Sequence, residues 1–348
     1  MAIPDEKFEE IRKYLEKSEN PLIMFDDDPD GLCSFLTMNK LCDRGKHVVI
    51  KASPKLDVQY LNKITEYGPD LVVVLDKPIV SQEFIDNIQV PILWIDHHPV
   101  LKRKGIHYYN PRINDEKDNR PTTYWCYKIV NKENALWIAT IGCISDWHIP
   151  DFIKEFTEKY PNIIIDEIKK PEDILFNTKL GLLSRIFSFI LKGDLADVKK
   201  CINVLTKIES PYEILNQETP KGKYIYKRYE VVNKEYQKLL SKALKSVTKE
   251  KLAVFTYKDA KISFTSDLSN ELIYKYPEKV ILIGREKSGE MKMSLRSKEI
   301  ILPKLIEKAL VGIKGSGGGH DYAIGSSVKI EDFDRFIGNL NDLLKTKD

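Results

Sequence analysis

Short apolar runs alternate with helix-like stretches along the first part of the chain, up to about residue 150. The apolar runs are rich in Val, Ile and Leu, and the stretches between them carry apolar residues at helical spacing. Strands of a parallel sheet that is covered by helices on both faces have this unbroken apolar character. The pattern therefore predicts an α/β domain around a parallel sheet. We expect strands at 22–25, 47–51, 71–75 and 92–95, and helices at 31–43, 58–67, 81–87 and 121–130.

The pattern changes twice beyond residue 150. Residues 151–250 are predicted to be almost wholly helical, and strand-like runs return at Leu252 as LAVFTY, KISFTS, KVILIG and MKMSLRS. A Gly-rich loop then precedes a closing helix that starts near Asp332. A chain of 348 residues has room for two ordinary domains. We expect an α/β domain at 1–190, a helical connector at 191–250 and a smaller α/β domain at 251–348, with a cleft between the two domains.

Composition narrows the classes of protein only a little. The formal charge is +3, from 55 Lys and Arg against 52 Asp and Glu, so binding to nucleic acid would depend on local patches. The five cysteines form no CxxC pair, which predicts reduced thiols in a cytoplasmic protein. The N-terminus is a charged amphipathic helix rather than a signal peptide. The most apolar later stretch, 174–191, contains Lys179 and Arg185, so we expect a buried helix and no membrane span.

Acids and histidines follow apolar elements in four separate segments. An Asp after a strand commonly caps the next helix, and this is the better interpretation of any one of them alone. Ligand sites, however, form beyond the carboxyl ends of parallel strands, where several such ends converge. The four segments are PLIMFDDDPDGLCSF at 21–35, LVVVLDK ending in Asp76, PILWIDHHP with Asp96, His97 and His98, and IATIGCISDW with Asp146.

This mixture of carboxylates and imidazoles suits Mn²⁺ or Mg²⁺ better than Zn²⁺. Five or more candidate ligands exceed what one such ion needs from a protein. Two ions about 3.5–4 Å apart would use them, and phosphoester hydrolases have that arrangement. The expected ligands are Asp28, Asp30, Asp76, His97 and Asp146, with Asp26 as a further candidate that could instead orient a neighbour.

The remaining residues of these segments have other predicted roles. Asp76 ends a central strand and is the best candidate to bridge both ions. Asp27 is expected to face solvent, Asp96 to orient His97 or its loop, and Trp147 to belong to the core. Gly31 lets the backbone approach closely at the turn.

The motifs resemble those of the DHH phosphoesterase superfamily. The resemblance rests on the DHH triplet at 96–98, the DxDxDG motif at 26–31, Asp76 and Asp146, and on GSGGGHDYAIG at 315–325, which resembles the GGGH motif of the DHHA1 domain. It spans nearly the whole chain apart from the helical connector. Met24 stands where the nanoRNase and pyrophosphatase branches have a histidine, so the first motif resembles that of RecJ-type exonucleases. The size is similar to the compact archaeal RecJ-like nucleases, such as the Hef-associated nuclease.

Two positions depart from the pattern of the superfamily. Lys77 and Pro78 follow Asp76, where a small residue or glycine is common, and Ile324 stands where alanine is usual. Neither change removes a ligand, but both could reshape the substrate pocket.

The resemblance also implies residues that hold the substrate. His98 is expected to contact the scissile phosphate. In the C-terminal domain, the backbone of Gly317, Gly318 and Gly319 offers N–H groups to an anion, although such a loop alone is usually only a turn. His320 follows directly, and Arg296 can grip a phosphate bidentately.

The connector is a second candidate for substrate binding. Residues 221–251 hold ten bases against three acids, interleaved with tyrosines at 224, 226, 229 and 236. Bases with aromatic residues can follow a phosphate backbone and stack bases. A solvated helix with its tyrosines on the core face is at least as good an interpretation.

The leading hypothesis is a manganese-dependent exonuclease that acts on single-stranded DNA or RNA and releases 5′-mononucleotides. Similarity to compact relatives implies 3′→5′ cleavage, a dimer or tetramer, and a possible replication or repair partner. One alternative is a hydrolase of very short oligoribonucleotides or of the bisphosphorylated nucleotide pAp. Another is a non-catalytic replication scaffold, which the intact acids of every metal motif argue against.

Overall fold

The computed structural model describes residues 2–51, 55–164, 170–258 and 261–345, and it divides into two compact units, Met1–Tyr229 and Glu230–Asp348. The division falls inside one helix, α12 (Pro220–Lys245). The predicted domain boundaries at residues 190 and 250 stay predictions. Each unit is described by itself below.

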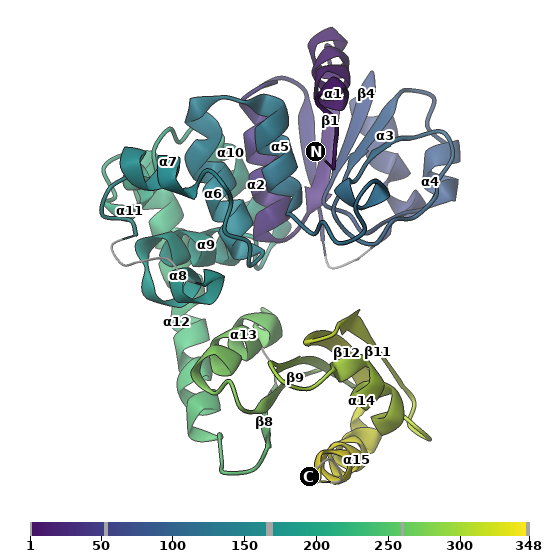
Figure 1. Cartoon of the computed structure of the whole chain (residues 1–348), viewed down its shortest axis with the longest axis vertical. Coiled ribbons are helices and arrows are strands. Elements are labelled where there is room, and N and C mark those ends of the chain that lie inside the picture. The colour runs from purple at the N-terminus through teal and green to yellow at the C-terminus, as the bar shows by residue number, and fades with distance from the viewer. Residues whose placement is uncertain (1, 52–54, 165–169, 259–260, 346–348) are drawn as a thin grey trace. The chain divides into compact units, whose positions relative to one another are not determined.

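The first unit is built on a five-stranded parallel sheet in the order β2-β1-β4-β6-β7 (Figure 1). One face packs against α3 and α4 in a cluster that includes Met24, Val74, Trp94 and Phe84. The helices α2 and α5 pack against each other beside β1. The elements are α1 (Asp5–Lys17), β1 (Pro21–Asp26), α2 (Pro29–Asn39), β2 (Lys46–Ile50), α3 (Leu61–Tyr67), β4 (Leu71–Leu75), α4 (Gln82–Asp86), β6 (Ile92–Ile95), β7 (His107–Tyr109) and α5 (Thr122–Val130), with a small parallel pair, β3 (Lys55–Leu56) and β5 (Ile79–Val80).

A helical region completes the first unit. The helices are α6 (Leu136–Ser145), α7 (Ile153–Lys159), α8 (Pro171–Asn177), α9 (Lys179–Ile190), α10 (Leu195–Leu205), α11 (Pro211–Leu215) and the first part of α12. Helix α6 is buried along nearly its whole length and packs against α2, α5 and α9. Among the described residues, no helix is long and apolar enough to cross a membrane.

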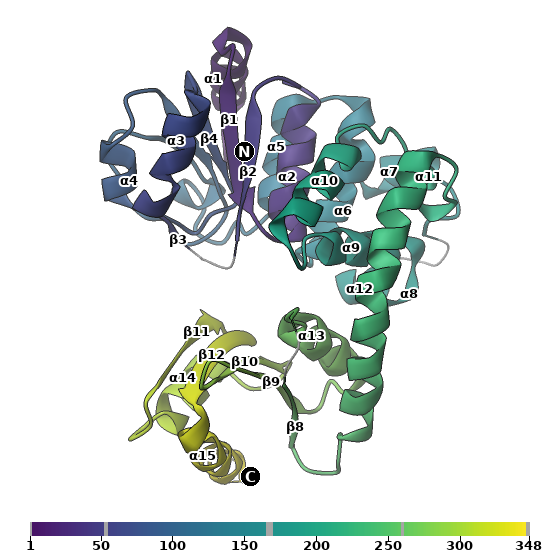
Figure 2. The same ribbon diagram turned by 180° about the vertical axis from the view of Figure 1, so that it is seen from behind.

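The second unit contains a five-stranded mixed sheet in the order β11-β12-β10-β9-β8, seen from behind in Figure 2. Strands β8 and β9 are parallel and the other neighbours are antiparallel. Helices α14 and α15 cover one face through an apolar cluster, and α13 contacts β9 and β10. The elements are β8 (Leu252–Tyr257), α13 (Thr265–Lys275), β9 (Val280–Lys287), β10 (Glu290–Ser297), α14 (Leu302–Ala309), β11 (Gly315–His320), β12 (Ala323–Lys329) and α15 (Phe333–Lys345).

The predicted α/β fold class is confirmed, and two local predictions are wrong. Residues 261–266 form no strand, because the last two of them already begin α13. The Gly-rich segment is a strand rather than a loop: β11 pairs with β12 along its whole length. Glycine usually weakens a strand, but here the β12 backbone supplies a complete set of partners on one side.

Candidate metal centre

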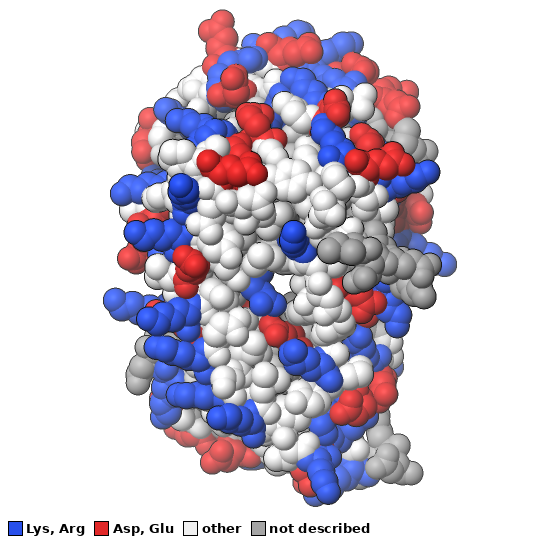
Figure 3. All heavy atoms as spheres, turned by 90° about the vertical axis from the view of Figure 1, so that its left-hand side faces the viewer, with Lys and Arg blue, Asp and Glu red and all other residues white. Residues whose placement is uncertain are grey.

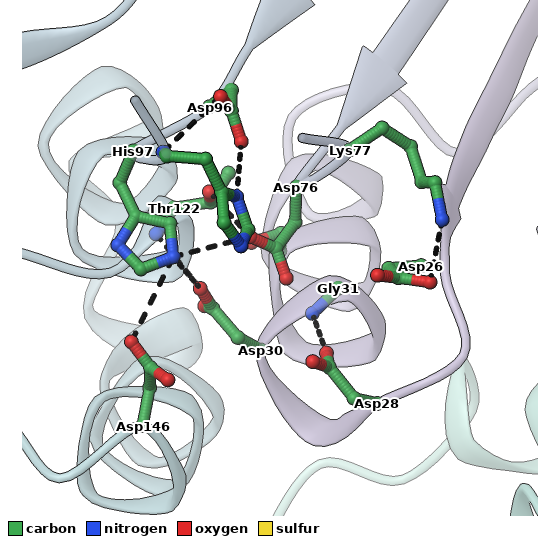
Figure 4. A network of polar contacts seen from close by, with 12 residues as sticks. Asp26, Asp28, Asp30, Gly31, Asp76, Lys77, Asp96, His97, Thr122 and Asp146 are labelled. Atoms are coloured by element: carbon green, nitrogen blue, oxygen red, sulfur yellow. Dashed lines mark hydrogen bonds and ion pairs between the residues drawn. The ribbon is translucent and has the colours of Figure 1, made fainter. Parts of the chain in front are cut away.

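Three neighbouring strands bring acids to the same edge of the first sheet (Figure 4). Asp26 is the last residue of β1, Asp76 follows β4 directly, and Asp96 follows β6 directly. Because the strands are parallel, their carboxyl ends meet at one edge. Asp28 and Asp30 lie at the start of α2, and Asp146 follows the last residue of α6. The structure thus brings the acids of all four sequence segments into one region.

Asp76 occupies a left-handed backbone conformation, with a φ of 58°. Its N–H donates to the carbonyl of Ile95 at 2.9 Å, and its Oδ1 accepts from the Thr122 hydroxyl at 2.9 Å. The residue is 1% exposed. Burial, reinforced by the charges of Asp30 and Asp28, raises the pKa of Asp76 well above its usual range. Non-glycine residues in this conformation cluster at functional sites, where the surrounding structure enforces them.

Asp30 is held by the first turn of another helix. Its carboxylate accepts from the backbone N–H of Thr122 at 2.9 Å and of Thr123 at 2.8 Å, which open α5. The Thr123 hydroxyl also donates to the Asp30 carbonyl at 2.8 Å. The first N–H groups of a helix lack partners within the helix and favour a negative charge. The fold thus supplies partners for a carboxylate at Asp30, which is only 3% exposed.

His97 lies among three carboxylates. Its Nε2 is 3.5 Å from Asp76 Oδ1, 3.9 Å from Asp30 Oδ2 and 3.8 Å from Asp146 Oδ2. On the other side of the ring, Nδ1 lies 3.2 Å from the Asn119 carbonyl. A carbonyl can only accept, so Nδ1 carries a proton, and Nε2 is the ring nitrogen that faces the carboxylates.

Two overlapping sets of donor atoms in this region are compact enough to hold a cation. Asp30, His97 and Asp146 form one set, and Asp76, His97 and His98 form the other, with all donor atoms of a set within 4.8 Å of one another. The mixture of carboxylate oxygen and imidazole nitrogen fits Mn²⁺ well, and Mg²⁺ less well. Asp146 is the most accessible of the three acids, with 40% of its side chain exposed.

Asp96 orients His98 rather than His97, which corrects one of the two roles expected for it. Its carboxylate lies 2.7 Å from His98 Nδ1 and accepts from the His98 backbone N–H at 3.1 Å. Tyr108 and Asn110 donate to the same carboxylate. With a fully buried side chain and these partners, Asp96 fixes the position of the His98 ring.

The remaining acids of the first motif are engaged elsewhere. Asp26 accepts from the Lys77 ammonium at 2.8 Å, and Asp27 lies 3.7 Å from that of Lys51, so Asp27 does not simply face solvent. Asp28 caps α2 by accepting from the Gly31 N–H at 2.9 Å. A Cβ atom on Gly31 would lie 2.6 Å from the Asp26 carbonyl oxygen, so only glycine fits. Neither Asp26 nor Asp28 belongs to the two donor sets.

In the second unit, register aligns Arg296 with the Gly-rich strand. Arg296 pairs with Ala323 on β12, and Ala323 pairs with His320 on β11, so the three side chains project from the same face of the sheet. Nε of Arg296 donates to Asn270 Oδ1 at 2.6 Å. Burial lowers the pKa of Arg296 to about 10, and the guanidinium is still charged at neutral pH.

The three glycines of β11 differ in what surrounds them, although all are exposed. A Cβ atom on Gly317 would meet Ile306 Cγ2 of α14 at 2.7 Å. Gly319 has a φ of 150°, and a Cβ there would meet the Ala323 carbonyl at 2.4 Å. Gly318 has nothing within 4 Å of such an atom. Gly318 therefore borders open space on the face that carries Arg296 and His320.

The connector helix α12 buries two of its tyrosines, Tyr229 and Tyr236, as the core-face interpretation expects. Tyr224 is 41% exposed. Figure 3 faces the side on which α12 lies in Figure 1, and Lys and Arg gather there at the left of the lower half. The exposed lysines of the helix are Lys223, Lys227, Lys234, Lys238, Lys242 and Lys245. Trp147 is also 36% exposed, with a φ of 59°, so its prediction as a core residue is wrong.

Sequence reasoning missed the partners of the predicted site residues. Thr122 and Thr123 bind Asp30 and Asp76, and Asn119 holds His97. One signal was present: Pro121 followed by two threonines marks a helix start, whose free N–H groups attract a carboxylate.

The two sheets and this cluster of donor atoms define an α/β protein with a candidate metal centre in its first unit and a second α/β unit after it. Residues 249–346 match the family model of the DHHA1 domain. The fold resembles that of exonuclease RecJ bound to manganese, with a TM-score of 0.68 at 14% identity over 99% of this chain and 95% of that chain. It also resembles RecJ from Thermus thermophilus in complex with Mn²⁺, with a TM-score of 0.67 at 15% identity over 97% of this chain and 54% of that one.

A third solved structure has the same fold. It is the DHH domain of a member of a family of ribosomal proteins, with a TM-score of 0.68 at 14% identity over 97% of this chain and 89% of that one. No curated protein matches the sequence. Residues 249–346 thus match the DHHA1 domain, and the chain has a RecJ-like fold, which confirms the resemblance seen in its motifs.

Proposed function

We propose that the chain is a metal-dependent phosphodiesterase that shortens single-stranded DNA or RNA from one end and releases 5′-mononucleotides. One observation carries the proposal: His97 Nε2 lies within 3.9 Å of carboxylate oxygens from Asp30, Asp76 and Asp146. Donors of these types, converging from separate elements, suit a cation that acts on a phosphodiester. RecJ, whose fold this chain shares, is an exonuclease whose structure holds manganese.

The residues that would hold the metal are assigned from their positions. Asp30, His97 and Asp146 would hold one ion. Asp76 and Asp28 would contribute to holding a second, with Asp76 as the candidate ligand shared by both. Mn²⁺ is the proposed ion, with Mg²⁺ as a weaker substitute. When bound, the ions supply the positive charge and the acidified water that phosphodiester hydrolysis requires.

Groups in each unit are assigned roles in holding the substrate. Asp96 holds Nδ1 of His98 at 2.7 Å, which orients the imidazole ring for contact with the scissile phosphate through Nε2. In the second unit, Arg296 and His320 share one face of the sheet with Gly318. We assign this face to the end of the strand, with Arg296 on a phosphate and the backbone of Gly317, Gly318 and Gly319 close to the nucleotide.

Digestion of end-labelled strands tests the proposal. Single strands of DNA and RNA, labelled at the 5′ end or the 3′ end, are incubated with Mn²⁺ and the products are resolved as a ladder. We expect mononucleotides and progressive shortening from the 3′ end. Cleavage of dinucleotides or pAp with no effect on long strands would favour the short-substrate hydrolase instead, and metal binding without any hydrolysis would favour the scaffold.

A further inference from the structure

A lysine is buried directly beside the proposed metal centre. Lys77 follows Asp76, is 0% exposed, and places its ammonium 2.8 Å from Asp26 Oδ1 (Figure 4). Buried lysines are rare and need a counter-charge, because an ammonium loses several kcal/mol of hydration when it leaves water.

The position of Lys77 is fixed by the fold. The left-handed conformation of Asp76 turns the chain just before it. The indole N–H of Trp94, a fully buried residue of β6, donates to the Lys77 carbonyl at 2.9 Å. The backbone of Lys77 is therefore fixed just after the end of β4 by its hydrogen bond to Trp94. Its side chain extends to the end of the adjacent strand β1, where Asp26 lies.

Asp26 belongs electrostatically to the acid cluster. Its charge is among the causes that raise the pKa values of Asp28 and Asp76. An ammonium on Asp26 cancels part of that negative field. It would also repel a second cation placed against the same carboxylate, and a metal that captured Asp26 would leave Lys77 buried without this counter-charge.

We propose that Lys77 is a built-in cation that engages Asp26, so that Asp26 is not a metal ligand and the two metal positions bind with unequal affinity. The ion held by Asp30, His97 and Asp146 is the tight one. A second ion, which Asp76 and Asp28 would help to hold, would bind weakly because the ammonium of Lys77 already places a positive charge on Asp26. This inference rests on the metal centre proposed above.

Calorimetric titration of the metal-free protein with Mn²⁺ tests the idea, together with the spin coupling of bound Mn²⁺ pairs measured by electron paramagnetic resonance. The wild type should show one tight ion and one weak ion. Lys77→Met frees Asp26 and should tighten the second ion by about tenfold or more. Asp26→Asn should leave the affinity for the tight ion unchanged and lower the thermal midpoint. The double variant, Lys77→Met with Asp26→Asn, should bring the affinity for the second ion back to its weak wild-type value.

Control measurements distinguish a failure of the role inferred for Lys77 from a failure of the proposed metal centre. Lys258→Met removes a lysine from an exposed ion pair with Glu286 in the second unit, and should change no metal affinity. Two equally tight ions in the wild type, with one lost in Asp26→Asn, would make Asp26 a ligand and overturn the inference alone. No Mn²⁺ binding by the wild type would overturn the metal centre as well. If Lys77→Met does not fold, the Asp26→Asn titration still decides between these outcomes.

Discussion

The acid edge of the first unit and the Gly-rich strand of the second are built in opposite ways. At the acid edge the working groups are side chains. Asp30 and Asp76 are buried and have polar partners, helix N–H groups for Asp30 and a hydroxyl for Asp76, and an ammonium pairs with the half-buried Asp26. Along β11 four of the six residues are glycines, and the strand is exposed. Buried charges need partners that the fold must supply, whereas bare backbone needs only to be held extended.

This difference predicts what a substitution changes in each unit. At the acid edge, a substitution should remove a metal ligand or its charge and should create little empty space in the core. On β11, a substitution should affect either the access of the substrate or the packing against α14, depending on the face of the sheet from which the new side chain projects.

The largest effect is expected from His97→Ala. We expect hydrolysis of both long strands and small phosphodiesters to fall by about a thousandfold or more, since one donor at a transition-state charge already contributes about 10²–10³. Mn²⁺ affinity, measured by calorimetry, should fall with it. His107→Ala is the matched control: this histidine begins β7, at the opposite end of the strands, and should leave turnover intact.

A smaller and more selective loss is expected from Arg296→Ala. Hydrolysis of strands should fall by about a hundredfold through lost positioning, while small phosphodiesters and Mn²⁺ affinity change little. Lys292→Ala, on the same face of β10, controls for loss of positive charge. Equal loss on both kinds of substrate would assign Arg296 to the fold of the domain instead of substrate binding.

Substitutions at two neighbouring glycines should distinguish an effect on packing from an effect on the access of the substrate. Gly317→Ala meets Ile306 and should lower the free energy of unfolding by about 1–3 kcal/mol through overpacking. Gly318→Ala faces open space, so its stability should be unchanged while the KM for strands rises. Chemical denaturation and strand kinetics on both variants check this, and destabilisation by Gly318→Ala would contradict it.

The smallest predicted effect is on stability against pH. The raised pKa of Asp76 means that the metal-free folded state keeps a proton which the unfolded state has lost above the ordinary Asp range. Stability therefore falls as pH rises from that range towards the raised pKa. The thermal midpoint without metal should be lower at about pH 7 than at about pH 5, and Mn²⁺ should reverse the order. Asp76→Asn should remove much of this dependence.

The sequence predicts the acid edge well because the acids follow apolar runs whose unbroken character indicates parallel strands. It could not predict the partners, which lie far along the chain: Asp30 and Thr122 are separated by 92 positions, and Asp26 and Lys77 by 51. The β11 strand was missed for another reason. Successive glycines favour a turn locally, and only the long-range pairing with β12 overrides this tendency.

The two amide hydrogen bonds to Asp30 also bear on how quickly an ion can enter. Its carboxylate is already aimed and held by the start of α5 before any ion arrives. Capture then requires little rearrangement of the protein, so the speed of loading is set by how readily the ion sheds its own water. Mg²⁺ dehydrates reluctantly. We therefore expect Mg²⁺ to activate the metal-free protein more slowly than Mn²⁺ does, in addition to any difference between their affinities at equilibrium.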